Sequence, residues 1–172
     1  ETLSIDSARD QINSLLDALE LLDDTLLIFT LPNADAEGDV IKSAILNFVE
    51  NKENAIARES LGQILYLSCL QFVDGVVGNS SSGIIEAPSF NIGTVNIGNR
   101  QEGRVKSKSV IDCDFDTNQI YQAICNLTSD DFNKVVNGAT NPYDYGDSSQ
   151  KIVDILATFQ LPKHLMKRFK DL

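Results

Sequence analysis

The sequence predicts an α/β fold in which a parallel sheet lies between two layers of helices, and three observations support this. The 172 residues, 42% of them apolar, suffice for one compact domain with a hydrophobic core and are too few for two. Helix-type and strand-type hydrophobic patterns alternate along the chain, and short polar or glycine-containing breaks separate them. Alternation of this kind is typical of a Rossmann-like three-layer domain with right-handed crossovers.

The first half of the chain is expected to contain three helices and two strands. Residues 6–22 place leucines and isoleucine at helical spacing, and a strand follows at 26–30. After a Pro-Asn turn, apolar positions within 40–49 predict a second amphipathic helix. A short strand at 55–57 then leads to a helix around 62–72.

The second half continues the alternation as far as a proline. The expected elements are a strand at 75–78, a helix from 83 to about 90, strands at 94–97 and 109–112, helices at 117–127 and 130–136, and a helix from a Gly146-Asp-Ser-Ser cap to about 159. Pro162 interrupts the pattern, and the residues after it predict a short basic amphipathic helix. We therefore expect a domain over 1–161 and a C-terminal helix over 162–172 that needs a neighbour for its apolar face.

Charge and composition exclude several classes of function. A formal charge of -11 argues against a nucleic-acid or membrane-binding surface, because phosphate recognition on that scale needs a basic stripe. No apolar run approaches the roughly 18 residues that span a bilayer. The three cysteines are far apart and odd in number, which favours buried thiols in a reducing cytoplasm over disulfides or a metal site. We expect no cofactor and no dedicated metal site.

The clearest functional motif runs from Val76 to Glu86, where a strand ends in small polar residues and turns into a helix. Backbone N–H groups at such a turn, with the hydroxyls of Ser80 and Ser81, can hold a diphosphate without a lysine. Glu86 follows about one turn later, where its carboxylate can accept hydrogen bonds from the two hydroxyls of a ribose. Taken alone, the stretch also fits a helix cap followed by a solvated glutamate.

A second motif, Asn96 to Arg104, favours the anion-binding interpretation. It places Arg100 and Arg104 just after the next strand, at the same edge of the predicted sheet. Arginines there can neutralise a phosphate. The acidic run Asp112–Asp116 lies between a strand and a helix, so we interpret it as capping and solvated carboxylates rather than an acid–base pair.

These residues together resemble the UDP-N-acetylglucosamine 2-epimerases, in particular the hydrolysing branch that serves synthesis of sialic-acid-type sugars. The resemblance covers most of the chain up to about Asn126. It is carried by Pro32–Ala36, Ala57–Gly62, Tyr66–Ser68, Gly78–Pro88 and Thr94–Arg104.

The resemblance implies a fold of two Rossmann-like domains facing a cleft, the glycosyltransferase-B arrangement, with this chain as the C-terminal domain that binds UDP. It assigns the diphosphate to Ser80, Ser81 and the Gly83 turn, and the ribose to Glu86. The backbone near Leu61 would hold the uracil, and Asn33 and Arg100 would face the cleft on the side of the sugar diphosphate.

The implied reaction eliminates UDP from UDP-N-acetylglucosamine through a glycal-like intermediate and then adds water, giving N-acetylmannosamine or a related sugar. Catalytic carboxylates would lie in the N-terminal domain, so no catalytic residue is expected in this chain and it would be inactive alone. The helix at 162–172 would pack on that domain, and the full-length protein would be a homo-oligomer. A glycosyltransferase donor domain and a non-catalytic nucleotide-binding module remain alternatives, although the Asn96–Arg104 motif favours the epimerase.

Overall fold

The computed structural model of the chain describes residues 8–32, 38–50 and 52–160. The chain divides into two compact units between Pro142 and Tyr143. The expected boundary after residue 161 and the expected helix at 162–172 stay predictions, because residues 161–172 lie outside the described part. None of the described helices is long and apolar enough to cross a membrane.

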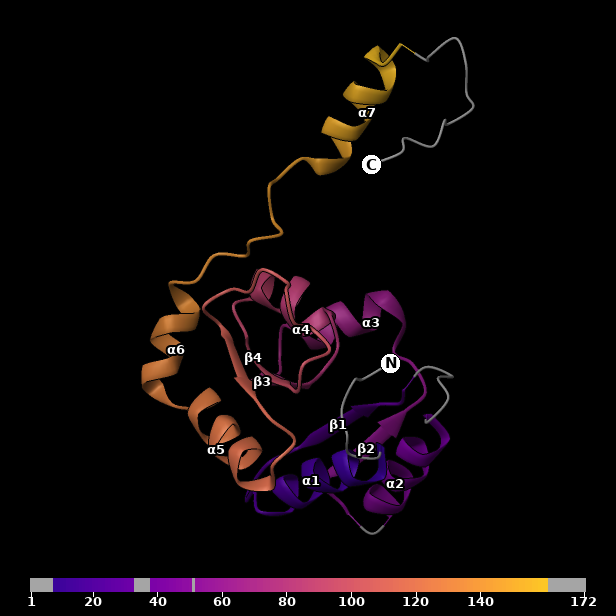
Figure 1. Ribbon diagram of the computed structural model, residues 1–172, viewed down its shortest axis with the longest axis vertical. Coiled ribbons are helices and arrows are strands. Elements are labelled where there is room, and N and C mark those ends of the chain that lie inside the picture. Colours follow the sequence, from indigo (N-terminus) through magenta and orange to yellow (C-terminus); the bar gives the residue numbers. More distant parts are fainter. Residues whose placement is uncertain (1–7, 33–37, 51, 161–172) are drawn as a thin grey trace, which may run out of the picture. The chain divides into compact units, whose positions relative to one another are not determined.

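Helices and strands alternate in the order that the sequence predicts (Figure 1). In the first unit they are α1 (Ala8–Glu20), β1 (Leu27–Thr30), α2 (Gly38–Glu50), β2 (Ala55–Arg58), α3 (Gly62–Cys69), β3 (Gly75–Gly78), α4 (Ser82–Ile85), the 3-10 helix η1 (Ala87–Phe90), β4 (Gly93–Ile97), β5 (Val110–Cys113), α5 (Thr117–Leu127) and α6 (Asp130–Asn137). The second unit contributes α7 (Ser148–Thr158). Each strand begins and ends within one residue of its predicted limits.

All strand pairs of the described chain are parallel, as expected, but they form two sheets instead of the single sheet that the sequence suggested. One sheet has the order β1-β2 and the other β3-β4-β5. Val95 of the central strand pairs with Val77 on one side and Ile111 on the other. Every residue of β4 is buried, whereas Ile28 of β1 and its partner Ile56 of β2 are exposed. The hydrophobic pattern identifies strands but does not say which strands become neighbours, which explains the difference.

Helices cover both faces of the three-stranded sheet (Figure 1). On one face α5 packs its Ile120, Ile124 and Leu127 against Val95 and Ile97 of β4, and together they belong to the main hydrophobic core. Helix α1 joins the same core and contacts α2 and α5. Because successive strand residues alternate faces, the side chain of Thr94 points to the opposite face, where α4 and η1 lie.

The helix predicted from residue 83 to about 90 is shorter than expected. Four residues form α4, and a 3-10 turn with Pro88 near its start follows. Pro88 has no N–H to continue the α-helical ladder, and it disfavours α-helical geometry at Ala87. The chain then leaves the turn at Asn91, which has a left-handed backbone with φ 54°. Glu86 consequently lies at the junction of two short helices.

Candidate functional site at the serine loop

The loop formed by residues 79–82, here called the serine loop, follows the carboxyl end of β3. Gly78 ends that strand with φ +146°, a backbone conformation that residues with a Cβ rarely adopt. The chain then turns sharply, and α4 begins at Ser82. Ligands of parallel α/β sheets collect at this edge. The loop thus lies at the sheet edge for which the sequence analysis predicted an anion site.

The serine hydroxyls contribute little to capping α4, which weakens the simplest alternative explanation of the motif. Ser81 is the N-cap residue, yet its backbone is helical and its side chain makes no capping hydrogen bond. The Ser80 hydroxyl oxygen accepts a long hydrogen bond of 3.3 Å from the Ser82 N–H. By contrast, Asp116 caps α5 and Ser129 caps α6 in the usual way, each accepting from the N–H three residues later.

Several backbone donors of this segment also lack protein partners. The N–H groups of Ile84 and Ile85 donate to the Ser81 carbonyl, but among the described residues no protein acceptor receives the N–H groups of Ser80, Ser81 or Gly83. Unpaired N–H groups next to hydroxyls favour an anion. Since α4 has only four residues, these individual groups matter more than a summed helix dipole.

Tyr66 of α3 contacts the end of the serine loop. Its hydroxyl makes a short hydrogen bond with the Ser82 hydroxyl, in which either oxygen can be the donor. Burial raises the pKa of Tyr66 above its usual value of 10.0, the Ser82 bond opposes this, and the charge of Glu86 raises the pKa further. The phenol is therefore neutral at physiological pH and available as a hydrogen-bond donor. The contact also places α3, which directly follows Leu61, beside the loop.

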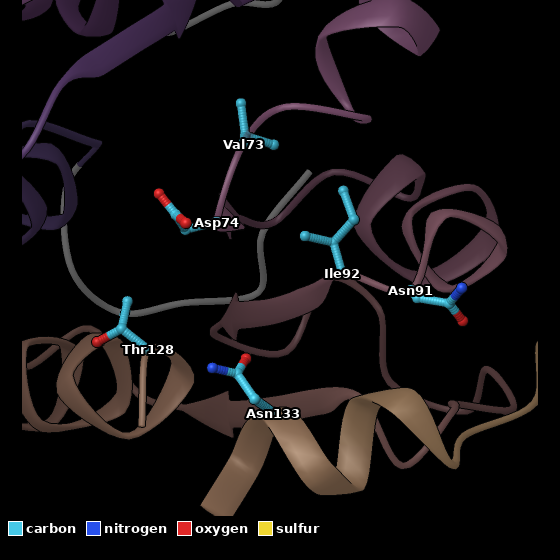
Figure 2. Close-up of a pocket in the computed structure, with 6 residues that line it drawn as sticks. All are labelled: Val73, Asp74, Asn91, Ile92, Thr128 and Asn133. Carbon is cyan, nitrogen blue, oxygen red and sulfur yellow. The ribbon is translucent and has the colours of Figure 1, made fainter. Parts of the chain in front are cut away.

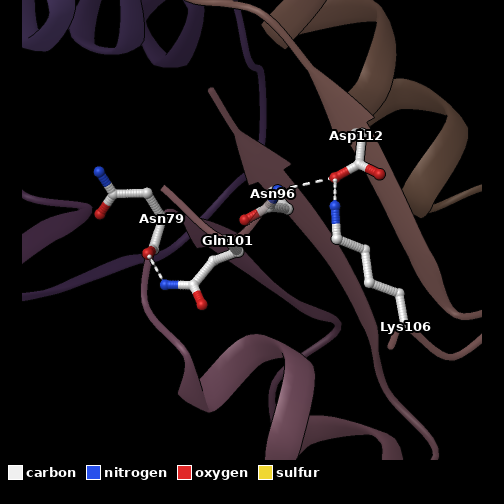
Figure 3. Close-up of polar contacts among 5 residues, drawn as sticks. All are labelled: Asn79, Asn96, Gln101, Lys106 and Asp112. Carbon is white, nitrogen blue, oxygen red and sulfur yellow. Dashed lines mark hydrogen bonds and ion pairs between the residues drawn. The ribbon is translucent and has the colours of Figure 1, made fainter. Parts of the chain in front are cut away.

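Gln101 contacts the other end of the serine loop. Its side-chain Nε2 donates a 2.8 Å hydrogen bond to the main-chain carbonyl of Asn79, as Figure 3 shows. Gln101 is buried, with 4% of its surface exposed, whereas its neighbour Arg100 is exposed. The two motifs that the sequence analysis singled out thus meet in space. Arg100 directly precedes Gln101 in the sequence.

A second polar cluster joins β4 to β5, also shown in Figure 3. Asn96 and Asp112 are register partners, and Asn96 Nδ2 donates to Asp112 Oδ1 at 2.7 Å. Lys106 Nζ lies 2.6 Å from the same oxygen. Asp112 is thus engaged in a cross-strand contact, while Asp116 is the helix cap that the sequence predicted. Neither observation supports an acid–base pair in this acidic run.

Gly83 and Glu86 occupy the segment that follows the serine loop. The Gly83 carbonyl accepts a 2.7 Å hydrogen bond from the Thr94 hydroxyl, so the start of α4 is tied to β4. Glu86 is half-buried. Beside it, Asn141 Nδ2 donates to the carbonyl of Ile85 at 2.8 Å and to the Ser89 hydroxyl at 2.6 Å. The Thr94 bond thus ties α4 to the sheet, and the Asn141 bonds tie α4 and η1 to the segment after α6.

The structure therefore gathers most of the residues that the sequence indicated. Ser80, Ser81, Gly83 and Glu86 lie in one segment, and Arg100 is next to a residue that touches it. Asn33 lies outside the described residues. The contacts of Tyr66, Gln101 and Asn141 were not predicted. The sequence analysis included Tyr66 and Gln101 only as members of motifs, without a role of their own. Asn141 lies 56 residues from Ile85 in the sequence.

Two cavities of the described chain lie away from the serine loop. One, of about 240 Å³, lies at the opposite edge of the sheet (Figure 2). It is lined by residues just before β3 and β4, by the C-cap of α5 and by a residue within α6: Val73, Asp74, Asn91, Ile92, Thr128 and Asn133. The other, of about 320 Å³, lies beside Asp112 and includes Gly98, Asn99 and Glu102 of the second motif. No group of three His, Cys, Asp or Glu side chains within the described ranges is arranged to hold a metal ion.

Comparison with known proteins gives a consistent result. Residues 1–157 match the family described as UDP-N-acetylglucosamine 2-epimerase. The chain is 38% identical over 173 aligned residues to the polysialic acid biosynthesis protein P7 of Escherichia coli, covering 99% of the chain and 43% of that protein. It is 36% identical to the GDP/UDP-N,N'-diacetylbacillosamine 2-epimerase (hydrolyzing) of Campylobacter jejuni, covering 99% of the chain and 44% of the relative. The chain thus spans less than half the length of these relatives.

Solved structures show the same fold. A putative UDP-N-acetylglucosamine 2-epimerase from Listeria monocytogenes superposes with a TM-score of 0.68 at 14% identity, over 87% of this chain and 40% of that one. A structure described as an S. aureus MnaA-UDP co-structure gives a TM-score of 0.68 at 19% identity, again over 87% and 40% of the two chains. The predicted fold class, a Rossmann-like domain of the glycosyltransferase-B type, is confirmed.

Proposed function

Since the chain belongs to the UDP-N-acetylglucosamine 2-epimerase family, we propose that it is the C-terminal, UDP-binding half of a hydrolysing 2-epimerase. The supporting observation is the serine loop, which offers the Ser81 hydroxyl, not used for capping, and backbone N–H groups without acceptors in the described part of the chain. The family assignment favours this function over a glycosyltransferase donor domain or a non-catalytic nucleotide-binding module.

The diphosphate of UDP would be held by Ser80, Ser81 and the backbone at Gly83. Hydroxyl and amide donors suit this role in a chain of net charge -11, because they attract an anion locally without a basic surface. Arg100, which is exposed and directly precedes Gln101, would add a positive charge. Asn33 would approach from the cleft side.

The nucleoside would be recognised by Glu86 and by the backbone near Leu61. Glu86 lies one turn beyond the serine loop, and its carboxylate can accept hydrogen bonds from both ribose hydroxyls. Leu61 directly precedes α3, and α3 reaches the serine loop through Tyr66. Uracil would therefore lie near the start of α3, with the phosphates toward α4.

Chemically, this half would act on the leaving group. When the bond between C1 of the sugar and the diphosphate oxygen breaks, negative charge develops on that oxygen. Donors already fixed around the diphosphate stabilise this charge more in the transition state than in the ground state, which lowers the barrier. The carboxylates that move protons at the sugar would come from the segment that the relatives have in addition to this chain.

The names of the relatives support a proposal for the substrate class. They include enzymes of N,N'-diacetylbacillosamine and of N-acetylglucosamine, and a protein of polysialic acid biosynthesis. We propose a UDP-linked 2-acetamido or 2,4-diacetamido sugar as substrate and the free N-acetylmannosamine-type sugar and UDP as products. Location in the cytoplasm, a homo-oligomer at full length, and packing of residues 162–172 on the N-terminal domain belong to the same proposal.

Calorimetric titration with UDP tests the proposal. The measurement compares the 172-residue chain with its Ser81→Ala and Glu86→Ala variants, and with a longer protein that carries the additional segment of the relatives. UDP release from UDP-N-acetylglucosamine is assayed in parallel. We expect the unchanged chain to bind UDP, both variants to bind it several-fold more weakly, and only the longer protein to turn substrate over.

Two outcomes would contradict the proposal in different ways. If only the longer protein binds UDP, the nucleotide is not held by this half alone. If neither binds UDP at millimolar concentration although both are folded, this protein does not share the nucleotide specificity in the family's name.

A further inference from the structure

We propose that Tyr66 and Gln101 are positioning residues that hold the two ends of the serine loop in the conformation that receives a diphosphate, before any ligand arrives. The inference rests on the proposed UDP site and adds to it two residues that need not touch the nucleotide. Tyr66 acts on Ser82, and Gln101 acts on Asn79. Between these two ends lie Ser80 and Ser81, whose N–H groups have no protein acceptor in the described chain.

At the Ser82 end, the direction of the hydrogen bond decides what the serine can do. A hydroxyl has one donor and can accept as well. If the Tyr66 phenol donates to Ser82 Oγ, the Ser82 hydrogen points elsewhere and is available for an oxygen of a phosphate. A tyrosine phenol is protonated at physiological pH, and burial raises the pKa of Tyr66 further, so the donor is present.

At the Asn79 end, the contact is made to the main chain. Gln101 Nε2 donates to the Asn79 carbonyl, and Gln101 is almost fully buried. Its Oε1 is buried and has no hydrogen-bond partner among the described residues. The amide of Gln101 therefore has a defined orientation. Reversing it would place Oε1 against the Asn79 carbonyl oxygen, and the hydrogen bond would be lost.

Fixing a loop in its bound conformation raises affinity because less conformational entropy is lost when the ligand binds. The effect should concern the part of the ligand that the loop touches. Loosening the serine loop should therefore weaken binding of the diphosphate of UDP, and leave binding of the nucleoside unchanged. This difference separates positioning from a general loss of structure.

The experiment measures affinities of UDP and of uridine for the 172-residue chain and its variants Tyr66→Phe, Ser82→Ala and the double variant. We expect Tyr66→Phe to weaken UDP binding by about threefold to tenfold, the range of one neutral hydrogen bond. Uridine binding should stay within twofold. In the Ser82→Ala background, Tyr66→Phe should cause no further loss, because its partner is gone. Tyr121→Phe, a half-buried tyrosine of α5 that contacts Cys125, is the matched control and should bind UDP normally.

The Gln101 arm uses Gln101→Met, which keeps the side-chain length and removes the donor. UDP binding should again weaken by about threefold to tenfold while uridine binding stays within twofold, with thermal unfolding monitored to show that the variant is folded.

Three results would overturn the inference. Normal UDP affinity in folded Tyr66→Phe or Gln101→Met would show that the contact does not prepare the loop. An equal loss for UDP and uridine would indicate a general structural role. Failure of both the unchanged chain and the longer protein to bind UDP would remove the proposed site itself, and that outcome is distinguishable because it appears before any substitution is made.

Discussion

The hydroxyl of Thr94 donates a 2.7 Å hydrogen bond to the carbonyl of Gly83, and its methyl group fills the space that a side chain at residue 83 would need. A Cβ at residue 83 would lie 2.5 Å from Thr94 Cγ2 and 3.3 Å from its Oγ1. Thr94 is fully buried in the central strand and restricted at χ1, so it has little freedom to move. Gly83 is therefore required by packing, independently of any ligand.

Gly83→Ala should lower the free energy of unfolding by about 1–3 kcal/mol, the usual cost of adding a methyl group to a filled site. Urea denaturation measures this. Gly138→Ala is the control, because a Cβ at residue 138 has no neighbour closer than 3.6 Å, and it should leave stability nearly unchanged. Equal stability of the two variants would contradict the packing role of Gly83.

Asp112→Ala should lower the free energy of unfolding. Most of the loss should come from the hydrogen bond with Asn96, and less from the ion pair with Lys106. The Asp112 side chain is 55% exposed, so its ion pair with Lys106 contributes little. Asn96 is 1% exposed and its Oδ1 already lacks a partner in the described chain, so loss of Asp112 leaves the whole amide unsatisfied. The expected cost is about 1–3 kcal/mol, measured by denaturation at low and high salt. Lys106→Met should cost much less, and a similar loss in both variants would show that the ion pair dominates.

Removal of the α5 cap should be measurable, whereas removal of a similar aspartate before α7 should not. The Asp116 carboxylate accepts a 2.9 Å hydrogen bond from the Gln119 N–H, and Asp116→Ala is expected to cost about 1 kcal/mol of stability. Asp147 occupies the N-cap position of α7 but makes no capping bond with its side chain, contrary to the cap expected from the sequence. Asp147→Ala should thus change the stability and the helical signal in circular dichroism very little. A loss of stability as large as that of Asp116→Ala would contradict this distinction.

Cys113 should make folding sensitive to alkaline pH. Burial, followed by the charges of Asp114 and Asp112, raises the pKa of its thiol from 9.0 to about 11. Because the pKa is raised in the folded state, the contribution to stability is complete below about pH 9 and is lost as the pH rises through about 11. Cys113→Ala should flatten the fall in unfolding free energy over this window, and an unchanged slope would contradict the assignment.

The same thiol should react slowly with alkylating agents. The raised pKa keeps the Cys113 thiol almost entirely protonated at pH 8, and only the thiolate is nucleophilic. Cys125 is exposed on α5, so iodoacetamide should modify it before Cys113. Mass spectrometry of timed samples gives the order, and faster labelling of Cys113 would contradict it.

The fold could be predicted from the sequence in its elements but not in its pairing. Hydrophobic periodicity located each described helix and strand of the first unit, because burial of one face depends on local spacing. The division into two sheets depends on which strands meet, which spacing does not encode. The end of α4 was the exception among the elements. Pro88 indicates an early end of this helix, but the helical spacing of the apolar residues around it led to the prediction of a longer one.

The candidate site shows the same division between local and distant information. The serine loop and the second motif could be recognised because glycine, serine and arginine cluster in short stretches. The contacts of Tyr66 with Ser82 and of Asn141 with Ile85 join residues 16 and 56 positions apart, and no local pattern reveals them. Such contacts become visible only when α3 and the segment after α6 have taken their places on the sheet.

The bond from Gln101 ends on a main-chain oxygen, and this has a consequence for protein engineering. Any residue at position 79 presents the same carbonyl, so the anchor is indifferent to which side chain stands there. Position 79 can therefore be randomised in a library selected for altered sugar-nucleotide preference, while the scaffold around it is retained. Position 101 is different, because substitution there removes the side-chain donor itself and is expected to weaken the anchor.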